Sequence, residues 1–554
     1  MIPTTQKPGS SRYYIWFPLL FSVVLVGGML IGMKMQSTAP AVAIDKAEDE
    51  LSDQSVGQGK IEELLRYIEA KYVDEVDREE LIQEAIDNVL KNLDPHSSYI
   101  PADEVQEVNE HLDGNFDGIG VEFIILEDTV VVVAPLADGP SEAAGILAGD
   151  KIVMIGDSVV AGKNLESRDI VDLLRGEKGS RVKVGIRRGA ESKLRFFNIS
   201  RDKIPMHSVD ISMMLDNKTG YIKINRFSAT TYEEFMKSFE ELVTKKGMKD
   251  LVIDLRHNPG GYLQQATNIL SQFFRDKDKL LVYTEGRAVN RADYESNGRP
   301  FFDVDDVVVL IDEGSASASE ILAGAIQDQD RGIIIGRRSF GKGLVQEQYM
   351  LRDGSALRLT VARYYTPSGR SIQKPYRNNN KYDEEVIDRY ASGELYKGDL
   401  SKPRDTTRFF TAKGHVVYGG GGITPDVFVP MDSILTNDYY AELRQHIPQF
   451  VFRLMEKQKA GFKKYSLDKF KKSYKVSDAV WNDFLAYAKS QGVKPDARQN
   501  TVCKSEINRL LKSRIAKHLF GEEGYYAIWN EDDVMINKAL AILRKPNPLA
   551  EVKK

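Results

Sequence analysis

Cysteine and histidine are scarce in this sequence, and basic residues are not in surplus. A single cysteine, Cys503, among 554 residues excludes an intrachain disulfide, a cysteine-based zinc site and an iron–sulfur cluster. Only seven histidines occur and none lies in a His-Glu-x-x-His run, so a zincin-type metal site is excluded. The formal net charge is −5, from 76 basic and 81 acidic side chains, which argues against a nucleic-acid partner. We therefore expect neither a metal nor another cofactor.

One long apolar run stands at the start of the chain. Tyr14 to Met33 contains no charged residue, and twenty helical residues span about 30 Å, the thickness of a bilayer core. Lys7 and Arg12 precede the run, so the positive-inside tendency predicts a cytoplasmic N-terminus. We expect a single-pass anchor in the inner (cytoplasmic) membrane, with the rest of the chain extracytoplasmic and periplasmic. The small residues at 41–43 (Ala-Val-Ala) leave open a cleaved signal peptide.

The hydrophobic pattern beyond this run changes several times, which predicts a multidomain α+β protein. Apolar residues recur at spacings of three and four up to Asp94-Pro95, then β-branched runs follow, then strands alternate with helices, and the end is helical again. The expected parts are residues 1–35 (cytoplasmic head and membrane helix), 36–59 (tether), 60–113 (helical N-terminal domain), 114–202 (small β-barrel), 203–432 (α/β core with a polar insert at 374–408) and 433–554 (helical C-terminal domain).

Residues 114–202 resemble a PDZ domain, with β-branched strands, two short helices and a Gly-Ile-Leu-Ala-Gly-Asp run. PDZ modules bind a peptide C-terminus by strand addition, and exposed backbone amides capture its carboxylate. The stretch Gly118-Ile119-Gly120-Val121 matches that carboxylate loop, because glycine lets backbone N–H groups approach a ligand. A hairpin turn that merely requires glycine is the alternative.

Two stretches of the α/β part join an apolar strand to a helix. In the first, Asp254 leads to Asn258-Pro-Gly260-Gly261, and free N–H groups at such a helix start can bind a developing oxyanion. A simple strand–helix turn is the alternative. In the second, the run Ser-Ala-Ser-Ala-Ser-Glu places Ser317 at a helix start, with the following amide available to an oxyanion. Ser317 and Glu320 also fit a capping box, which is compatible with a chemical role.

A third stretch, Gly336 to Gly343, nearly matches a phosphate-binding loop. It fails at the last position, where Gly343 replaces the hydroxyl that would hold Mg²⁺, and the residues from Leu344 alternate like a strand. A P-loop-like NTPase is therefore a weaker alternative.

Together these stretches resemble the carboxyl-terminal processing peptidases, or tail-specific proteases, from Ile61 to Pro430. The lead-in Asn92-Leu-Asp-Pro-His-Ser-Ser-Tyr and the closing Gly422-Ile-Thr-Pro-Asp belong to the resemblance. The resemblance implies a crotonase/ClpP-like protease core and a serine endopeptidase that forms an acyl-enzyme. Its implied site residues are Ser317 as nucleophile, Lys342 as base, Gln346 to orient the lysine, and the amides of Ala318 and of Gly260 or Gly261 as oxyanion donors.

A lysine can act as a general base near neutrality only if its pKa falls from about 10.4, and burial in an apolar pocket does this. Phe340, Leu344 and Val345 are the apolar neighbours that could form such a pocket around Lys342. A Ser-His-Asp arrangement is the competing reading, and His257 is the one histidine inside a candidate motif.

The resemblance also implies that the PDZ domain captures substrate C-termini and gates the site, with Arg175 coupling the two; a solvated arginine at a helix end is the alternative. The expected partners are protein substrates, the membrane, and a second copy of the chain or an adaptor. A membrane-tethered PDZ scaffold without catalysis is the remaining functional alternative.

Overall fold

The computed structural model describes residues 59–136, 139–189, 191–376, 382, 384–397 and 407–553. The predicted membrane helix and almost all of the tether lie outside the described residues. Among the residues that are described, no helix is long and apolar enough to cross a membrane. The chain divides into two compact units, Met1–Val89 and Leu90–Lys554.

The described part of the first unit consists of two helices. They are α3 (Lys60–Lys71) and α4 (Arg78–Lys91), whose last two residues belong to the second unit. Arg78 begins α4 and its guanidinium forms ion pairs with Glu62 at 2.9 Å and Glu69 at 3.1 Å on α3. These ion pairs join the two helices. The apolar spacing in the sequence predicted helices in this region, and α3 and α4 are the helices found there.

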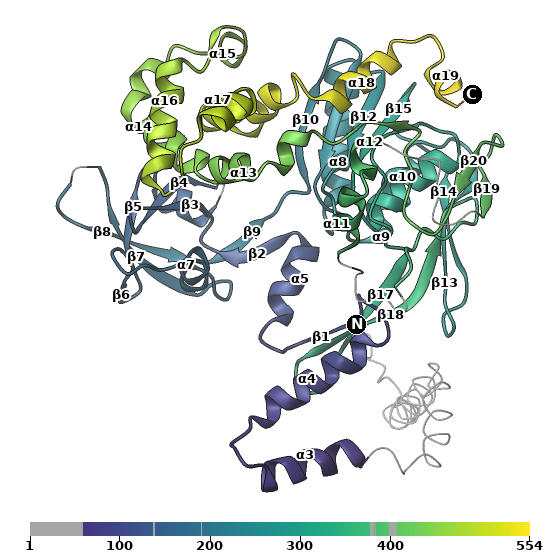
Figure 1. The fold of residues 1–554 in the computed structure, drawn as a ribbon, viewed down its shortest axis with the longest axis horizontal. Coiled ribbons are helices and arrows are strands. Elements are labelled where there is room, and N and C mark those ends of the chain that lie inside the picture. The colour runs from purple at the N-terminus through teal and green to yellow at the C-terminus, as the bar shows by residue number, and fades with distance from the viewer. Residues whose placement is uncertain are drawn as a thin grey trace, which may run out of the picture. The chain divides into compact units, whose positions relative to one another are not determined.

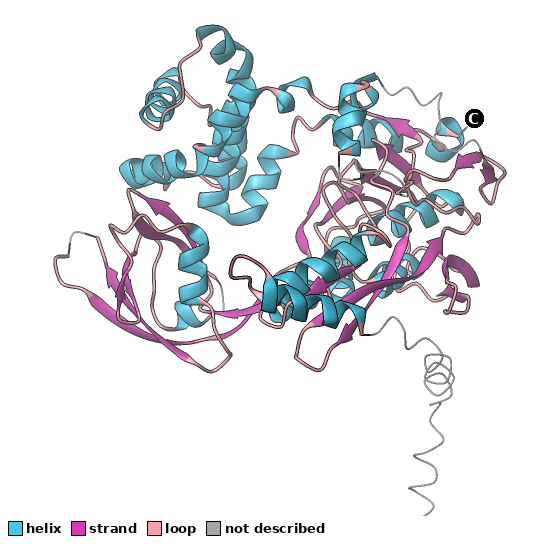
Figure 2. Cartoon of the chain, turned by 60° about the horizontal axis from the view of Figure 1, so that its bottom comes forward, coloured by secondary structure: helices cyan, strands magenta, loops and turns pink. Residues whose placement is uncertain are grey.

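The second unit begins with a short strand and a helix, followed by a small β-rich part. These elements are β1 (Ser98–Ile100), α5 (Val105–Asp113), β2 (Asn115–Gly118), β3 (Val121–Leu126), β4 (Thr129–Pro135), α6 (Pro140–Ala143), β5 (Lys151–Ile155), β6 (Ser158–Val159), α7 (Ser167–Leu174), β7 (Arg181–Arg187), β8 (Arg195–Ser200) and β9 (Asp202–Pro205). One sheet has the order β3-β4-β5-β7-β8 with β6 on β5, while β2 pairs with β9. Figure 2 shows the strands of this part with helix α7 beside them.

A six-stranded sheet in the order β10-β11-β12-β15-β16-β21 is the centre of the second unit. Its strands are β10 (Val209–Met214), β11 (Thr219–Ile224), β12 (Asp250–Asp254), β15 (Val307–Ile311), β16 (Ile333–Gly336) and β21 (Val427–Phe428). The pair β10 and β11 is antiparallel, and the other neighbours are parallel. The parallel strands read as continuous apolar runs because helices cover both of their faces.

Three helices cover one face of this sheet and one helix covers the other (Figure 1). Alternate residues such as Ile253 and Val309 pack against α8 (Thr231–Glu240), α9 (Leu263–Ser271) and α10 (Ala318–Asp328). A short π-helix, η2 (Glu241–Lys245), extends α8. Intervening residues such as Val252 and Val308 pack against α18 (Val534–Leu543) from the far end of the chain. The C-terminal segment therefore completes the core of the α/β part.

A second sheet has the strand order β1-β18-β13-β14, and β17 pairs with β18. Its strands from the α/β part are β13 (Lys277–Glu285), β14 (Ala292–Asn297), β17 (Leu344–Met350) and β18 (Ala356–Tyr365). A separate hairpin joins β19 (Arg408–Phe410) to β20 (Val416–Tyr418). Because β1 pairs with β18, the lead-in stretch is part of this sheet.

The polar insert and the C-terminal region are helical where they are described. The insert contains α11 (Glu385–Ala391) and α12 (Glu394–Lys397), and it buries the charged side chains Lys374 and Arg389. The C-terminal helices, cyan in Figure 2, are η3 (Ser433–Thr436), α13 (Asp438–Gln445), α14 (Ile447–Phe462), α15 (Leu467–Ser473), α16 (Asp478–Ser490), α17 (Ala497–Trp529), α18 and α19 (Pro548–Val552). Helices α13 to α17 share a core that includes Phe470, Phe484 and Cys503.

Candidate active site

Three loops meet at the carboxyl edge of the central sheet. They follow β12, β15 and β16, which are neighbours in the sheet and run parallel. The carboxyl ends of parallel strands meet at one edge, and ligands of α/β sheets bind there. The loops are residues 255–262, 312–317 and 337–343, which are the three stretches singled out in the sequence.

Ser317 occupies a strained position at the start of α10. Its φ of 54° and ψ of −116° lie in a region that residues with a side chain rarely adopt. The preceding strand β15 and helix α10 are both buried, and this fixes the sharp turn between them. Strain of this kind at a strand–turn–helix junction is typical of an exposed nucleophile.

The glycine turn lies against Ser317. A Cβ atom on Gly260 would come within 2.7 Å of the Cβ of Ser317 and 2.9 Å of the amide nitrogen of Ala318. Asn258 holds the turn, since its carbonyl accepts hydrogen bonds from the Ala316 N–H and the Ser319 hydroxyl, both at 3.0 Å. The structure thus brings Gly260 close to the amide of Ala318, two of the positions that the resemblance named as oxyanion donors.

The two glycines differ in what their amides do. The Gly260 N–H donates to the side-chain oxygen of Asn258 at 2.8 Å. Gly261 forms a parallel bridge with Phe227, yet its own N–H makes no hydrogen bond within the described part of the chain. A side chain at Gly261 would collide with the Phe227 carbonyl, at 2.1 Å from a Cβ atom. The amide of Gly261 is therefore the one left available to an incoming group.

The buried carboxylate of Glu320 joins the serine turn to the lysine loop. One oxygen accepts from the Ser317 N–H at 2.8 Å and the Lys342 N–H at 2.9 Å. The other accepts from the Gly341 N–H at 2.7 Å and the Ser339 hydroxyl. Burial raises the pKa of Glu320 to about 7, although these four donors favour its charged form. The sequence predicted the cap on α10 but not the link to the second loop.

Lys342 lies in a desolvated position near Ser317. Burial lowers the pKa of Lys342, the charge of Arg358 lowers it further, and the carboxylates of Glu320 and Asp94 act in the opposite direction. The Tyr364 hydroxyl donates to the carbonyls of both Ser317 and Lys342, which again joins the two loops. Of the expected apolar neighbours, Leu344 is buried, whereas Val345 and Phe340 are partly buried.

The lead-in motif ends close to this lysine. Asp94 accepts hydrogen bonds from the Thr360 hydroxyl at 3.0 Å and from the Ser97 amide at 2.9 Å. The Nε2 of Gln346 also donates a hydrogen bond to the Thr360 hydroxyl, at 3.2 Å. Gln346 and Asp94 therefore share Thr360 as a hydrogen-bond partner, and Asp94 is one of the carboxylates that act on the pKa of Lys342.

His96 is a neighbour of Lys342 that the sequence analysis missed. Its Nε2 lies 2.9 Å from the Tyr382 hydroxyl. Burial lowers the pKa of His96 to about 4, and the positive charge of Lys342 contributes to this shift. The sequence held a signal for this histidine, because His96 lies within the lead-in motif at residues 92–99.

The competing histidine, His257, faces solvent. Its Nδ1 lies 3.1 Å from the buried carboxylate of Asp312, but 79% of its side chain is exposed. Within the described residues no hydrogen bond joins His257 to Ser317. The lysine loop also fails as a phosphate loop, because it leads into strand β17 and its amides at 341 and 342 donate to Glu320.

The insert packs on the lysine loop through charged groups. Lys374 lies with its Nζ 3.7 Å from the centre of the Phe340 ring and 3.0 Å from a carboxylate oxygen of Glu385. Arg389 donates to the carbonyls of Ser339, at 3.1 Å, and Arg338, at 2.6 Å. This arrangement differs from a solvated polar loop, because each buried charge has a partner.

The predicted peptide loop joins β2 to β3. Gly118 ends β2, Val121 begins β3, and Gly120 has a φ of 69°, which a glycine adopts without strain. The Ile119 carbonyl accepts from the amide and the hydroxyl of Ser141, at 3.0 and 2.6 Å. The loop is therefore held in place by the start of α6.

Arg175 is not a solvated arginine. It follows α7, its Nη1 lies 3.2 Å from a carboxylate oxygen of Glu110, and its guanidinium stacks on Phe116 at 5.0 Å. Glu110 lies on α5, where the neighbouring Asn109 accepts a hydrogen bond from Gln348 of β17 at 3.1 Å. Helix α5 therefore contacts both Arg175 and the strand that carries Gln346.

Comparison with known proteins gives four family matches. Residues 218–381 match Peptidase family S41, residues 118–197 match the PDZ domain, and residues 22–104 match the activating protease CtpB N-terminal domain. Residues 439–521 match a family of unknown function.

Two curated relatives agree with these family matches. The chain is 36% identical over 372 residues to carboxy-terminal processing protease CtpB of Bacillus subtilis, covering 64% of this chain and 75% of that protein. It is 34% identical over 396 residues to a carboxy-terminal-processing protease of Bartonella bacilliformis, covering 70% and 89%. Among solved structures, the photosystem II D1 C-terminal processing protease is 32% identical with a TM-score of 0.32, covering 55% of this chain and 88% of that one.

Proposed function

The chain belongs to peptidase family S41 and is a carboxy-terminal processing serine protease with a PDZ domain, and on this premise we propose that Ser317 is its nucleophile and Lys342 its general base. The observation that supports this assignment best is the single buried carboxylate of Glu320, which binds the backbone amides of both residues. That contact sets the serine turn and the lysine loop in a fixed relation. The lowered pKa of Lys342 is the second support.

In the proposed reaction, neutral Lys342 takes the proton of the Ser317 hydroxyl as the oxygen attacks the scissile carbonyl. The Ala318 and Gly261 amides stabilise the oxyanion, and the amine leaves with the proton held by Lys342. Water then attacks the acyl-enzyme and gives one proton to Lys342. Lys342 returns that proton to the Ser317 oxygen as the acyl–oxygen bond breaks, which releases the new C-terminus and restores the serine hydroxyl. Gln346 is the proposed residue that orients Lys342.

We propose that the PDZ loop Gly118–Val121 captures the C-terminal carboxylate of a protein substrate. Arg175 then couples capture to catalysis through Glu110 on α5, because Asn109 on the same helix contacts β17.

We propose the location from the sequence alone. Residues 14–33 form the single-pass anchor, unless a signal peptide is removed after residue 43, and the peptidase acts on extracytoplasmic, periplasmic proteins. The sheet with helices on both faces supports a crotonase/ClpP-like core, and a second copy of the chain or an adaptor is the proposed protein partner.

The test is cleavage of an unfolded protein with an apolar C-terminus by the full chain in detergent. We expect cleavage by the wild type, none by Ser317→Ala or Lys342→Ala, and slower cleavage when the substrate ends in charged residues. Full activity of Lys342→Ala would refute the assignment of the base, and binding without cleavage by the wild type would refute the reaction.

A further inference from the structure

Helix α18, from the C-terminal end of the chain, begins next to the active-site edge of the sheet. Asp533 caps this helix, and its Oδ1 accepts from the amides of Met535 at 2.9 Å and Ile536 at 3.0 Å. Its other oxygen, Oδ2, accepts a hydrogen bond from Nη1 of Arg256 at 2.7 Å. The Asp533 side chain thus caps the start of α18 and pairs with the loop after β12.

Arg256 lies between two carboxylates. Its Nη2 donates to Oδ2 of Asp254 at 2.6 Å, and its Nε lies 3.0 Å from both oxygens of that side chain. Asp254 is fully buried and also accepts from the Tyr221 hydroxyl at 2.7 Å. The guanidinium has a planar fork of donors, so two carboxylates at its edges fix its orientation.

The backbone of Arg256 leads directly into the glycine turn. The Arg256 carbonyl accepts from Lys223 Nζ at 3.0 Å. Two residues later, the Asn258 carbonyl accepts from the Ala316 amide beside Ser317, and the Asn258 side chain accepts from the Gly260 amide. The orientation of residues 254–260 therefore sets the positions of both oxyanion donors.

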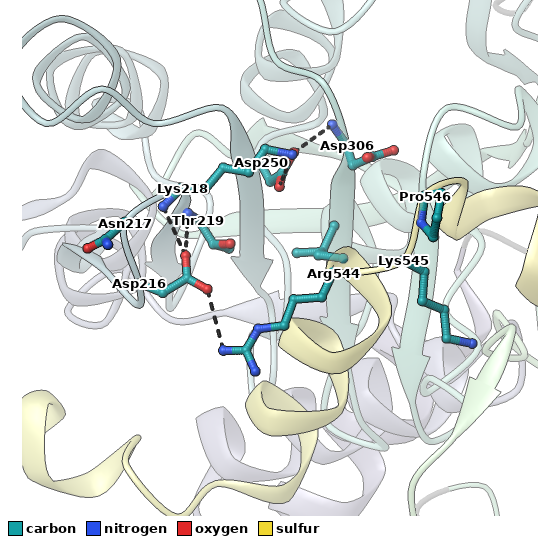
Figure 3. Close-up of a pocket in the computed structure, with 10 residues that line it drawn as sticks. Asp216, Asn217, Lys218, Thr219, Asp250, Asp306, Arg544, Lys545 and Pro546 are labelled. Atoms are coloured by element: carbon teal, nitrogen blue, oxygen red, sulfur yellow. Dashed lines mark hydrogen bonds and ion pairs between the residues drawn. The ribbon is translucent and has the colours of Figure 1, made fainter.

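The rest of the C-terminal segment holds α18 firmly on the core. Its apolar residues Met535, Ile536 and Ala539 pack on the central sheet. At its other end Arg544 pairs with Asp216 at 3.7 Å, at a cavity of about 580 Å³ where Lys218 also pairs with Asp250 (Figure 3). Lys553 is buried and donates to the Gln327 carbonyl at 3.0 Å. Asp533 is thus presented to Arg256 by a fixed helix.

We propose that Asp533 is a positioning residue for the peptidase reaction: it fixes Arg256, and through it the glycine turn that donates to the oxyanion. This inference rests on the proposed function, in which Gly261 and Ala318 are those donors. It makes the C-terminal helix a part of the active-site architecture, although Asp533 lies 277 residues from Arg256 in the sequence.

The test replaces Asp533 by asparagine in the full chain. Asparagine is as good a helix cap as aspartate, so the cap on α18 stays. The atom that faces Arg256 becomes an amide without charge, so the guanidinium keeps its pairing with Asp254 but loses the second carboxylate that fixes its orientation. The matched control is Asp496→Asn, because Asp496 caps α17 by accepting two backbone amides and no ion pair of Asp496 occurs among the described residues.

We expect kcat of Asp533→Asn to fall about tenfold with KM unchanged, less than the loss of about a hundredfold that removal of an oxyanion donor causes. Asp533→Glu should retain most of the activity, and Asp496→Asn should match the wild type. The melting temperatures of both asparagine variants should stay above the assay temperature.

An unchanged kcat of Asp533→Asn beside an active wild type would overturn the inference and leave the proposed function intact. So would a variant that is unfolded at the assay temperature, because Asp533 would then have a structural role only. Equal cleavage by the wild type and Ser317→Ala would instead refute the proposed function itself.

Discussion

One carboxylate oxygen of Glu320 lies 2.9 Å from the backbone nitrogen of Lys342, although the two residues belong to different loops. The same oxygen binds the Ser317 amide, so any change at Glu320 should be felt at both residues.

We therefore predict that Glu320→Gln impairs catalysis. Glutamine keeps the shape but has one acceptor oxygen, and its NH₂ would face the donors of Ser339 and Gly341 or those of Ser317 and Lys342. A hydrogen bond to a charged group contributes about 1.5–3 kcal/mol, so kcat should fall about 10- to 100-fold. Steady-state kinetics measures the loss of kcat, and thermal melting measures any loss of stability.

The matched control is Glu234→Gln on α8. Glu234 also accepts two backbone amides with one oxygen, those of Ser208 at 2.7 Å and Val209 at 3.0 Å. The Glu234→Gln variant should lose stability without a comparable loss of kcat. Equal kcat in both variants would contradict the role given to Glu320.

Gly260 provides a steric test of the glycine turn. Alanine there would place a methyl group 2.7 Å from the Ser317 Cβ at a φ of +98°, so we expect kcat/KM to fall by about a hundredfold or more. Gly247→Ala is the control, because Gly247 has a φ of +72° with nothing within 4 Å, and it should cost about 1 kcal/mol of stability only. Normal peptide cleavage by Gly260→Ala would place the oxyanion site elsewhere.

The strand and helix pattern of the sequence predicted the local form of the site. Ser317 and the Asn258–Gly261 turn both follow apolar strands, and the strand-to-helix pattern is enough to predict the elements on each side. Their meeting depends on the strand order β12-β15-β16, which a single sequence does not specify. The resemblance to a family supplied that information instead.

Other features had no local signal. The pair of Arg256 and Asp533 joins segments 277 residues apart, and nothing in the sequence around either residue points to the other. The insert reads as polar and solvated, yet Lys374 and Arg389 are buried because their charges are paired. Pairing of charges over long distances in sequence is invisible to periodicity and composition.

A pH titration tests the proximity of His96 to Lys342. We expect His96 to titrate at about pH 4, and at a higher pH in Lys342→Met, where a nearby positive charge is gone. The NMR signals of ¹³C-labelled histidine report this directly. An identical pKa in both proteins would contradict the placement of Lys342.

The lowered pKa of His96 also makes the free energy of unfolding depend on pH. The folded pKa of about 4 lies below the unfolded value near 6.5, so the unfolded chain binds more protons between these values. The free energy of unfolding should therefore fall as the pH drops from about 6.5 through 4, and this part of the slope should be missing in His96→Asn.

Arg175 tests coupling between the PDZ domain and the site. Arg175→Ala removes the ion pair with Glu110, and coupling energies between sites typically change rates by about 5- to 150-fold, so we expect at least a fivefold loss of kcat/KM. The loss should shrink for a substrate whose C-terminal carboxylate is amidated. Arg168→Ala, on the exposed side of α7, should behave as the wild type in both assays. A loss independent of the substrate's C-terminus would argue for a structural role.

The most direct test of the Ser317–Lys342 assignment is covalent labelling of the full chain with a fluorophosphonate, followed by mass spectrometry of the modified peptide and the labelling rate across pH. We predict one label on Ser317, at a rate that rises with pH through a lysine pKa below its ordinary value and that collapses in Lys342→Ala. A label on another serine, or a rate unchanged in Lys342→Ala, would contradict it.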